Sequence, residues 1–508
     1  MEIIRTKYNE LLGQMMAGHQ IINGVAIIIL IVWSQFTRAQ TVITLQQAIV
    51  LAQQSSLQVS LNKNNLEIAE QTYKLQRAQL FPQVNLNANL PGYNSSITSV
   101  TQPDGTIKFT TVEQAYSNVG ISLSQKIAAT GGTFTASSNI NRFDLLTGNR
   151  ISTFNTQPYV LGIVQPLFRF NETAYNLKTA KISKLIGSKV FVKQQEQLAA
   201  DVSSLFHTVL QAQTNIVLLT ATSNTTDTLL KTAKLKLALG KIGEEEYLQI
   251  QLEQLNTTAQ LQQAQNDVEL AKNKLFNMLN MPTKSEIVLE ATKPTAIQQQ
   301  QLEQTSSTIL FTQYKQNNPE YEQQRLAQMQ NYAALQRAKY TRLPSFNIIA
   351  GYGSNQSAPL LNDAYQNLLT QRNATVGVAV PLFTAGANSA SLKIATYQQQ
   401  NQQLQLQQLE QQMMNSILGQ LLAYNNALML IHNAQLTDSL AQRRYAISTN
   451  KFNAGKITYT DFLLAQNQRN QSKKNYINAI ASYWQAYYQL RASTMYDIET
   501  QESLYNKN

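Results

Sequence analysis

The chain has 508 residues, 14% of them charged, and a formal net charge of +11. It contains no cysteine, which excludes disulfides, thiolate metal sites and cysteine nucleophiles, and no dense block of Lys or Arg, which argues against nucleic-acid binding. Typical soluble domains carry about 25% charged residues, so the surface is polar without being ionic. Such a surface suits a water-filled conduit, a helical array with polar interfaces or a low-charge secreted protein.

Residues 1–39 are predicted to form an export signal. Arg5 and Lys7 precede an apolar stretch from Ile21 to Trp33, and the small residue Ala39 fits a cleavage site. The stretch is shorter than the about 20 residues that a spanning helix needs, although an uncleaved anchor is the alternative. No apolar run of spanning length follows residue 40, so a mature chain that crosses a membrane would have to form a closed β-barrel.

Residues 45–80 are expected to form a helix that Phe81-Pro82 ends, after which the period changes to two. In the run Gln83–Leu90, apolar side chains alternate with Asn, which predicts a strand with one apolar and one amide face. Shorter alternating runs predict further strands, at residues 119–123, 159–163, 345–352 and 374–380. Soluble sandwiches also contain such strands, but apolar-out, polar-in alternation is typical of outer-membrane barrels.

Very long helices are predicted after these strands. Residues 171–239 contain no proline and would span about 100 Å as one helix, with Asn171 as its N-cap. Apolar positions step by four and three, which indicates helices packed along their length. These seams are Leu198, Val202, Leu205, Val209, Ala212, Ile216 and Leu219; Leu261, Ala264, Val268, Ala271, Leu275 and Met278 in a return helix over 244–281; and Ile417, Leu421, Tyr424, Leu428 and Ile431.

The sequence is duplicated at an offset of 215 residues. Three phrases recur at this spacing: Gln165-Pro166-Leu167-Phe168 as Val380-Pro381-Leu382-Phe383, Gly240-Lys241-Ile242 as Gly455-Lys456-Ile457, and Glu246-Tyr247-Leu248 as Asp461-Phe462-Leu463. A fixed offset over a strand end and a distant loop indicates one structural unit written twice. We therefore predict a first repeat over 40–282, a linker over 283–307, a second repeat over 308–500 and a polar tail over 501–508.

The two repeats differ in length at their strands. Pro82 and Pro344 stand at equivalent strand starts but are 262 residues apart, so the first repeat holds 47 extra residues relative to the offset of 215. The extra residues include the alternating stretch 134–140 and polar loop sequence. They predict an additional β-hairpin at about residues 103–155.

Together these features resemble the TolC-type outer-membrane efflux protein family. The resemblance rests on the duplication, the Pro-Leu-Phe strand ends and the two glycine turns, and covers nearly all of the chain after residue 40. It implies a fold that is mainly α with β: very long coiled-coil helices forming an α-barrel, and strands forming a trimeric outer-membrane β-barrel. Four strands per copy would give 12 barrel strands and six would give 18. We expect 12, with the extra hairpin extending or capping the sheet.

The resemblance also implies a function and partners. The chain would be a passive trimeric channel of a tripartite efflux system, exporting small molecules from the periplasm or an inner-membrane pump to the exterior. Its partners would be two further copies, outer-membrane lipid, a periplasmic adaptor (membrane fusion) protein and a pump of the RND or ABC type. It would sit in the bacterial outer membrane and extend into the periplasm. The alternatives are an exit duct for type I protein secretion and a non-conducting periplasmic coiled-coil scaffold.

The resemblance further assigns roles to the turns. The adaptor would dock at Gly240, Lys241, Ile242, Gly455, Lys456 and Ile457, while Glu246, Asp461 and Phe452 match the periplasmic gate. The alternative is that each acid merely stabilises the first turn of a return helix. Leu464 and Ile457 stand where the family has an acidic and a basic residue. We therefore expect apolar contact, or Lys241 and Lys456, to hold the gate shut instead of a salt-bridge lock.

No motif of an enzyme is present: the chain lacks HExxH, GxSxG, a P-loop and GxGxxG. His207 and His432 each stand alone within a predicted helix, which favours helix packing over metal binding. The aromatic segment Tyr483–Tyr488 is likewise interpreted as a packing surface. We therefore predict no catalytic, cofactor-binding or metal-binding residue, and the nature of the cargo, whether drug, metal or protein, stays open.

Overall fold

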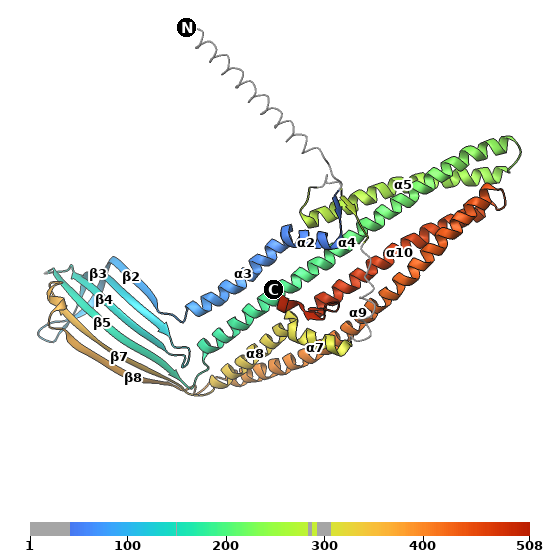
Figure 1. Cartoon of the computed structure of the whole chain (residues 1–508). Helices are drawn as coiled ribbons and strands as arrows, with labels where there is room; N and C mark the ends of the chain where they lie inside the picture. The colour runs from blue at the N-terminus through green and yellow to red at the C-terminus, as the bar shows by residue number, and fades with distance from the viewer. Residues whose placement is uncertain (1–40, 149, 283–286, 292–305, 508) are drawn as a thin grey trace, which may run out of the picture. The chain divides into compact units, whose positions relative to one another are not determined.

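A computed structural model describes residues 41–148, 150–282, 287–291 and 306–507 (Figure 1). The predicted export signal and most of the predicted linker lie outside the described residues. The chain divides into two compact units. One holds the residues up to Val59, Gln197–Leu302 and Ala423–Tyr488, and the other holds Ser60–Glu196, Glu303–Leu422 and Gln489–Asn508. No helix among the described residues is both long enough and apolar enough to cross a bilayer.

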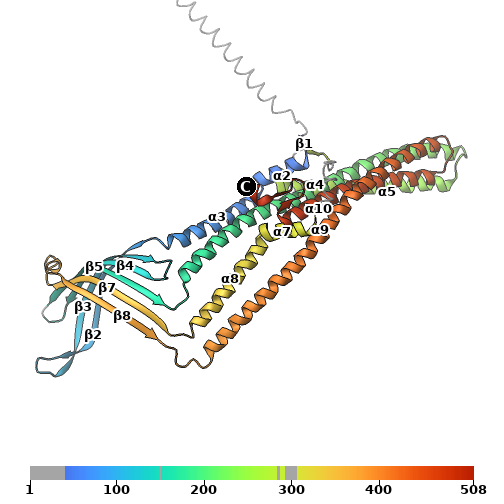
Figure 2. The ribbon, with the colours of Figure 1, turned by 60° about the horizontal axis from the view of Figure 1, so that its bottom comes forward.

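The unit that contains residues 60–196 carries a single six-stranded antiparallel sheet. Its strands follow the order β2-β3-β4-β5-β7-β8, so that β2 and β8 form the two edges, as Figures 1 and 2 show. The bounds are β2 Gln83–Thr101, β3 Ile107–Lys126, β4 Thr133–Leu145, β5 Ile151–Leu167, β7 Ser345–Ala358 and β8 Leu369–Ala379. The predicted strands are confirmed. Strands of this sheet that follow one another in the sequence are also hydrogen-bonded to one another.

The register divides the sheet into an apolar and a polar face. Residues that pair directly point to the same side, so the apolar alternation of one strand continues across its neighbours. One face carries Leu86, Ile121, Leu161, Tyr352, Ile348 and Val376, among others, and the opposite face carries Asn87, Gly120, Asn139, Gly162, Gly351 and Asn373. The large apolar side chains of the first face are exposed in the single chain.

The extra residues of the first repeat lie inside the sheet, which corrects the expectation of a hairpin that extends or caps it. β4 pairs along its length with β3 on one side, from Gln114↔Leu145 to Lys126↔Thr133, and with β5 on the other. The alternating stretch that starts at Phe134 has strand partners on both sides, so it satisfies its backbone within the ladder. Among the described residues this sheet therefore has six strands and not four.

The helices reproduce the duplication residue for residue. α4 (Glu172–Ala238) and α9 (Ala387–Asn453) each have 67 residues, and α5 (Glu244–Leu279) and α10 (Tyr459–Thr494) each have 36. All four pairs of bounds differ by 215. The shorter helices α2 (Leu45–Ser55) and α3 (Leu57–Ala78) recur as α7 (Ser307–Asn317) and α8 (Pro319–Tyr340) at an offset of 262. The 47 extra residues thus fall wholly between the leading helices and the long ones.

The leading helix predicted over 45–80 is broken at Ser56. The backbone of Ser56 is extended, and the same break recurs at Asn318, whose side chain accepts a hydrogen bond from the Glu320 amide and caps α8. The predicted N-cap Asn171 is confirmed, because its Oδ1 accepts a hydrogen bond from the Ala174 amide at 3.0 Å. Gly187, the glycine within α4, allows α3 to approach: a Cβ there would lie 2.6 Å from the Cβ of Ala69.

The predicted seams are packing positions. All five seam residues of α9, from Ile417 to Ile431, are buried, as are Leu198, Val202 and Val209 of α4 and Val268 of α5. The aromatic segment of α10 is also buried: Tyr483 lies against Tyr424 with ring centroids 5.4 Å apart, and Trp484 stacks on Tyr488. The segment is a helix-packing surface, as predicted.

Two small strand pairs and two short helical turns complete the described residues. β6 (Ile287–Leu289) lies inside the predicted linker and pairs in parallel with β1 (Thr41–Ile43). η2 (Asp363–Tyr365) forms part of the β7–β8 connection. After α10, β9 (Tyr496–Asp497) and β10 (Glu502–Ser503) form an antiparallel pair followed by η3 (Leu504–Lys507). Residues 502–507 of the predicted polar tail thus form a short strand and a helical turn, and Leu504 is buried.

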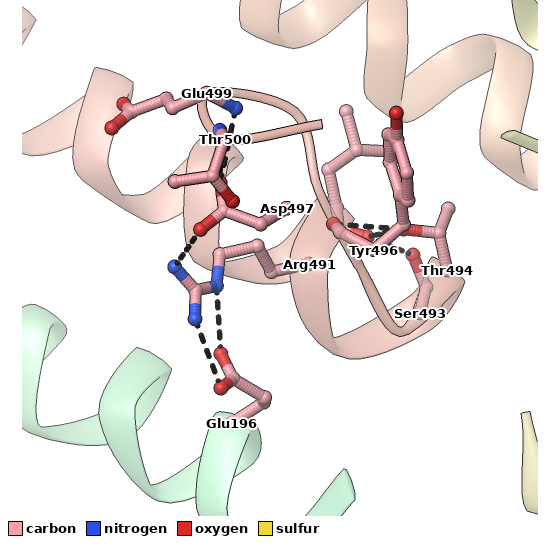
Figure 3. A network of polar contacts seen from close by, with 9 residues as sticks. Glu196, Arg491, Ser493, Thr494, Tyr496, Asp497, Glu499 and Thr500 are labelled. Atoms are coloured by element: carbon pink, nitrogen blue, oxygen red, sulfur yellow. Dashed lines mark hydrogen bonds and ion pairs between the residues drawn. The ribbon is translucent and has the colours of Figure 1, made fainter. Parts of the chain in front are cut away.

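The C-terminal pair is held by a charged network (Figure 3). The Arg491 guanidinium donates to both carboxylate oxygens of Glu196 on α4, at 2.8 and 3.0 Å, and to Asp497 at 2.9 Å. Asp497 also accepts a hydrogen bond from the Glu499 amide. One arginine therefore joins two carboxylates that are both largely removed from solvent.

Candidate functional site: the two helical turns

The two predicted turns, α4–α5 and α9–α10, have the same backbone construction. Gly240 and Gly455 adopt φ of +65° and +69°, in the left-handed region that favours glycine. The amide of Lys241 donates to the carbonyl of Lys236, and that of Lys456 to Lys451, both at 2.8 Å. The glycine amides donate to the carbonyls of Leu237 and Phe452, both at 2.9 Å, and the two kinds of bond together form a Schellman motif at the end of each long helix.

An apolar cluster joins the two turns, which lie in the same compact unit. Its buried members are Ala233, Ile250, Tyr459 and Phe462, from α4, α5 and α10. The turn residues Ile242 and Ile457 pack against it, and so does Phe452, whose ring stacks on Phe462 with centroids 5.1 Å apart. Burial raises the pKa of Tyr459 to about 12, so its hydroxyl stays neutral.

The two predicted gate acids differ in their surroundings. Asp461 is exposed and occupies the third position of α10, where its carboxylate accepts hydrogen bonds from the Thr458 hydroxyl (2.7 Å) and amide (3.2 Å). The Thr458 hydroxyl in turn accepts from the Asp461 amide, which completes a capping box. Hydrogen bonds from Thr458 hold the pKa of the Asp461 carboxyl below its usual value. In the single chain, Asp461 thus acts as a helix cap.

Glu246 holds the corresponding position of α5, where the N-cap residue makes no side-chain hydrogen bond. The N-cap there is Gly243, which has no side chain to donate, and Glu246 shares the first helical turn with Glu244 and Glu245. Lys241 and Lys456 are exposed, whereas Ile242 and Ile457 are half-buried against the cluster. Within one chain, apolar contact therefore links the turns, and the lysines take no part in it. Leu464 is exposed.

A polar layer on the same helices was not predicted. Asp438 is buried, and its Oδ2 accepts from Gln442 (3.0 Å) and lies 3.4 Å from the Lys473 ammonium. Nearby, the Arg469 guanidinium stacks on the Tyr445 ring at 4.3 Å. These residues line a cleft of about 420 Å³ together with Val217, Leu218 and Ala221 of α4. The signal was present in the sequence: Asp438 continues the seam of α9, seven residues beyond Ile431, at a position where an apolar residue is expected.

The strand-end markers lie in the other compact unit. Pro166 is within β5, opposite Asn347, whereas Pro381 and Phe383 follow the end of β8. Phe168 has a φ of +51° and meets Phe346 edge to face, with centroids 5.8 Å apart. Just beyond, Glu172 accepts two hydrogen bonds from Arg337, at 2.6 and 2.7 Å, which fixes the start of α4 against α8. These markers have structural positions at the junction of sheet and helices.

The two histidines among the described residues lie apart. His207 is buried, its Nδ1–H donates to the Ser203 carbonyl at 2.7 Å, and burial lowers its pKa. His432 is exposed on α9. Among the described residues, no group of three or more His, Cys, Asp or Glu side chains is placed to hold a metal ion.

The geometry of the second repeat can be compared with known proteins. Residues 310–494 match the family model described as outer membrane efflux protein. This match, which begins inside α7 and includes α8, α9, α10 and the Gly455 turn, confirms the resemblance to the TolC-type family. The first repeat lies outside it, but repeats the same helix bounds at the offset of 215. No curated protein matches the chain in sequence.

Solved structures share the TolC-like fold. The Campylobacter jejuni CmeC outer membrane channel is 15% identical with a TM-score of 0.64, over 89% of this chain and 85% of that chain. The outer membrane protein VceC from Vibrio cholerae is 13% identical with a TM-score of 0.63, over 89% and 95%. The Neisseria gonorrhoeae MtrE outer membrane channel in its open state is 16% identical with a TM-score of 0.61, over 89% and 88%. The fold predicted from the sequence, mainly α with a strand sheet, is confirmed.

Proposed function

We propose that this chain is an outer-membrane efflux channel in which three copies enclose one aqueous path. The channel is passive and belongs to a tripartite system, with a periplasmic adaptor at the two glycine turns and an inner-membrane pump that supplies the energy. The cargo is small molecules. The main observation behind this proposal is that one chain contains both an antiparallel sheet, one face of which is apolar and exposed, and two equal pairs of helices. Each pair has one helix of 67 residues and one of 36.

The sheet supports insertion into lipid. Large side chains such as Leu86, Ile121 and Val376 are exposed on one face, while the opposite face carries Asn, Ser, Thr and Gly. Soluble monomers rarely expose an apolar patch of this extent, whereas membrane barrels place such a face toward lipid and the polar face toward the lumen. A periplasmic scaffold would have no use for either face.

The test is whether the purified protein inserts and conducts. We expect fractionation with outer membranes, a trimer band on gels that heating converts to monomer, and discrete current steps in planar bilayers. A scaffold would fractionate with the soluble periplasm and pass no current, and that result would refute the channel. Restoration of drug resistance to a bacterium that lacks its own outer-membrane efflux channel would test the cargo; resistance left unrestored by a conducting protein would favour the protein-secretion alternative.

A prediction for Asp461 separates gate from helix cap. We expect Asp461→Ala to raise single-channel conductance or to weaken block by multivalent cations several-fold, because it removes one carboxylate per copy from the periplasmic entrance. Thr458→Val is the matched control, since it deletes the capping partner but keeps the charge. Unchanged conductance and block in Asp461→Ala, or equal effects of both variants, would remove Asp461 from the gate.

The capping role has its own pH dependence. The folded pKa of Asp461 lies below its unfolded value, so the cap stabilises the turn at neutral pH and is lost as the pH falls through the folded pKa. We expect acid to increase hydrogen exchange at the first amides of α10. The same acid step should have a smaller effect in Thr458→Val, which keeps only the amide bond to Asp461, and an equal response in that variant would contradict the role of the hydroxyl in the cap.

A further inference from the structure

We propose that β8 of one copy pairs antiparallel with β2 of the next, so that each copy contributes six strands and three copies close a barrel of 18 strands. The partner of each sheet edge is thus a second copy of this chain. The inference rests on the proposed trimeric channel and concerns the number of strands in its β-barrel.

All six strands are hydrogen-bonded into one sheet, so none of them is free to lie outside the barrel wall. β4 has partners on both sides, and its Ala136 stands opposite Leu123 of β3 and Leu161 of β5. Removing any strand from the wall would break a ladder and leave its amides and carbonyls unpaired in lipid, at a cost of several kcal/mol per group. All six strands therefore enter the barrel together.

The two edges are built to be paired. Among the described residues, β2 pairs only with β3 and β8 only with β7, and nearly every residue of both strands is exposed. Natural edge strands that stay unpaired are short or carry charges and bulges inward. β2 has 19 residues and none of them is charged, and its register shift between Asn89 and Gly92, with Pro91, leaves the stretch 83–89 regular; β8 has Arg372 alone. Val84 on β2 and Val376 on β8 are 65% and 64% exposed.

Direction and face both fit a head-to-tail ring. Because the sheet has an even number of antiparallel strands, β2 and β8 run in opposite directions, so β8 meets the next copy's β2 antiparallel. Such a heterologous contact closes into a ring when the three copies are related by a threefold rotation. The apolar positions are 84, 86 and 88 on β2 and 374, 376 and 378 on β8. Pairing even with even positions continues the apolar belt around the ring, whereas a slip of one residue would turn Asn toward lipid.

The strand count sets the width of the outer opening. With strands about 4.8 Å apart and tilted by about 40°, 18 strands enclose a cylinder of about 18 Å backbone radius, against about 12 Å for 12 strands. The cross-section at the outer end is then roughly twice that of a barrel built from four strands per copy.

The first experiment tests whether β4 lies in the wall. Because the chain has no cysteine, Ala136→Cys on the apolar face and Ser137→Cys on the polar face can each be labelled with bimane as a matched pair. After reconstitution into vesicles of brominated phosphatidylcholine, position 136 should lose most of its fluorescence and position 137 should not. Equal fluorescence at both positions would place β4 outside the bilayer and overturn the 18 strands.

The second experiment tests the seam between copies. Val376→Cys is combined in turn with a cysteine at position 84, 86 or 88, and the assembled protein is oxidised. At least one pair should give a ladder that ends at three chains, while each single-cysteine variant stays monomeric on a denaturing gel. A product within one chain, no product from any pair, or a ladder that ends elsewhere would overturn the proposal. Quenching with a three-chain ladder but no current would instead sink the channel function alone.

Discussion

Arg491→Ala is expected to release the C-terminal pair of strands from α4. The substitution leaves the carboxylates of Glu196 and Asp497, whose side chains are 11% and 6% exposed, without the guanidinium that neutralises both. Breaking a buried ion pair by removing one partner costs about 3–5 kcal/mol, because the remaining charge is stranded away from water. Hydrogen exchange at the amides of Glu499 and Thr500 should rise accordingly.

Two controls make this result specific. Arg325→Ala removes an exposed arginine that pairs with Glu322 on one helix, and we expect less than about 0.5 kcal/mol from it. A triple variant in which Arg491, Glu196 and Asp497 all become apolar should recover much of the protection, since no charge is then buried. Unchanged exchange in Arg491→Ala would mean that the segment is held by other contacts, such as those of the buried Leu504.

Phe462→Ala is expected to loosen both glycine turns at once. Phe462 is 1% exposed and contacts the rings of Phe452 and Tyr445, at 5.1 and 5.7 Å between centroids. Truncating a buried Phe costs about 3–5 kcal/mol through lost transfer free energy and the cavity that remains. We expect faster proteolysis near Gly240 and Gly455 and, in bilayers, a higher open probability, because the cluster holds α4, α5 and α10 together.

The matched control lies two residues away on the same helix. Leu464 is 58% exposed, so Leu464→Ala should change the free energy of unfolding by less than about 0.5 kcal/mol. The rate of proteolysis near the two glycine turns should therefore stay the same. If Phe462→Ala accelerated cleavage only near Gly455, the cluster would stabilise α10 alone and not the pair of turns. The effect would then be local packing with no bearing on the opening of the channel.

The helical part of the fold could be predicted well because its information is local. Heptad steps such as Ile417–Leu421–Tyr424 specify which face is buried, and a glycine ends each long helix. The break at Ser56 was missed, since neither Pro nor Gly marks it and only its repeat at Asn318 precedes a proline. The offset of 215 was sufficient to place both turns in the sequence, because the same glycine phrase closes the long helix of each repeat.

The sheet was harder to predict, because strand pairing is not encoded locally. The first strand was predicted over Gln83–Leu90, which Pro91 follows, yet β2 continues to Thr101 through a register shift between Asn89 and Gly92. An edge strand tolerates proline, since one side of its ladder carries fewer obligatory bonds within the chain. Likewise, the stretch from Phe134 signalled a strand but not its neighbours, so the number of strands in the sheet was misjudged. The Asp438 layer was missed because only the apolar members of the seam were followed.

The open edges of the sheet have a consequence for biogenesis. Under the proposed outer-membrane location, a newly exported chain would carry two unpaired strand edges and an exposed apolar face through the aqueous periplasm, where either can bind the wrong protein. Assembly of the trimer should therefore compete with irreversible aggregation. The yield of trimer should depend on how fast chains are exported and on whether a periplasmic chaperone binds them before assembly.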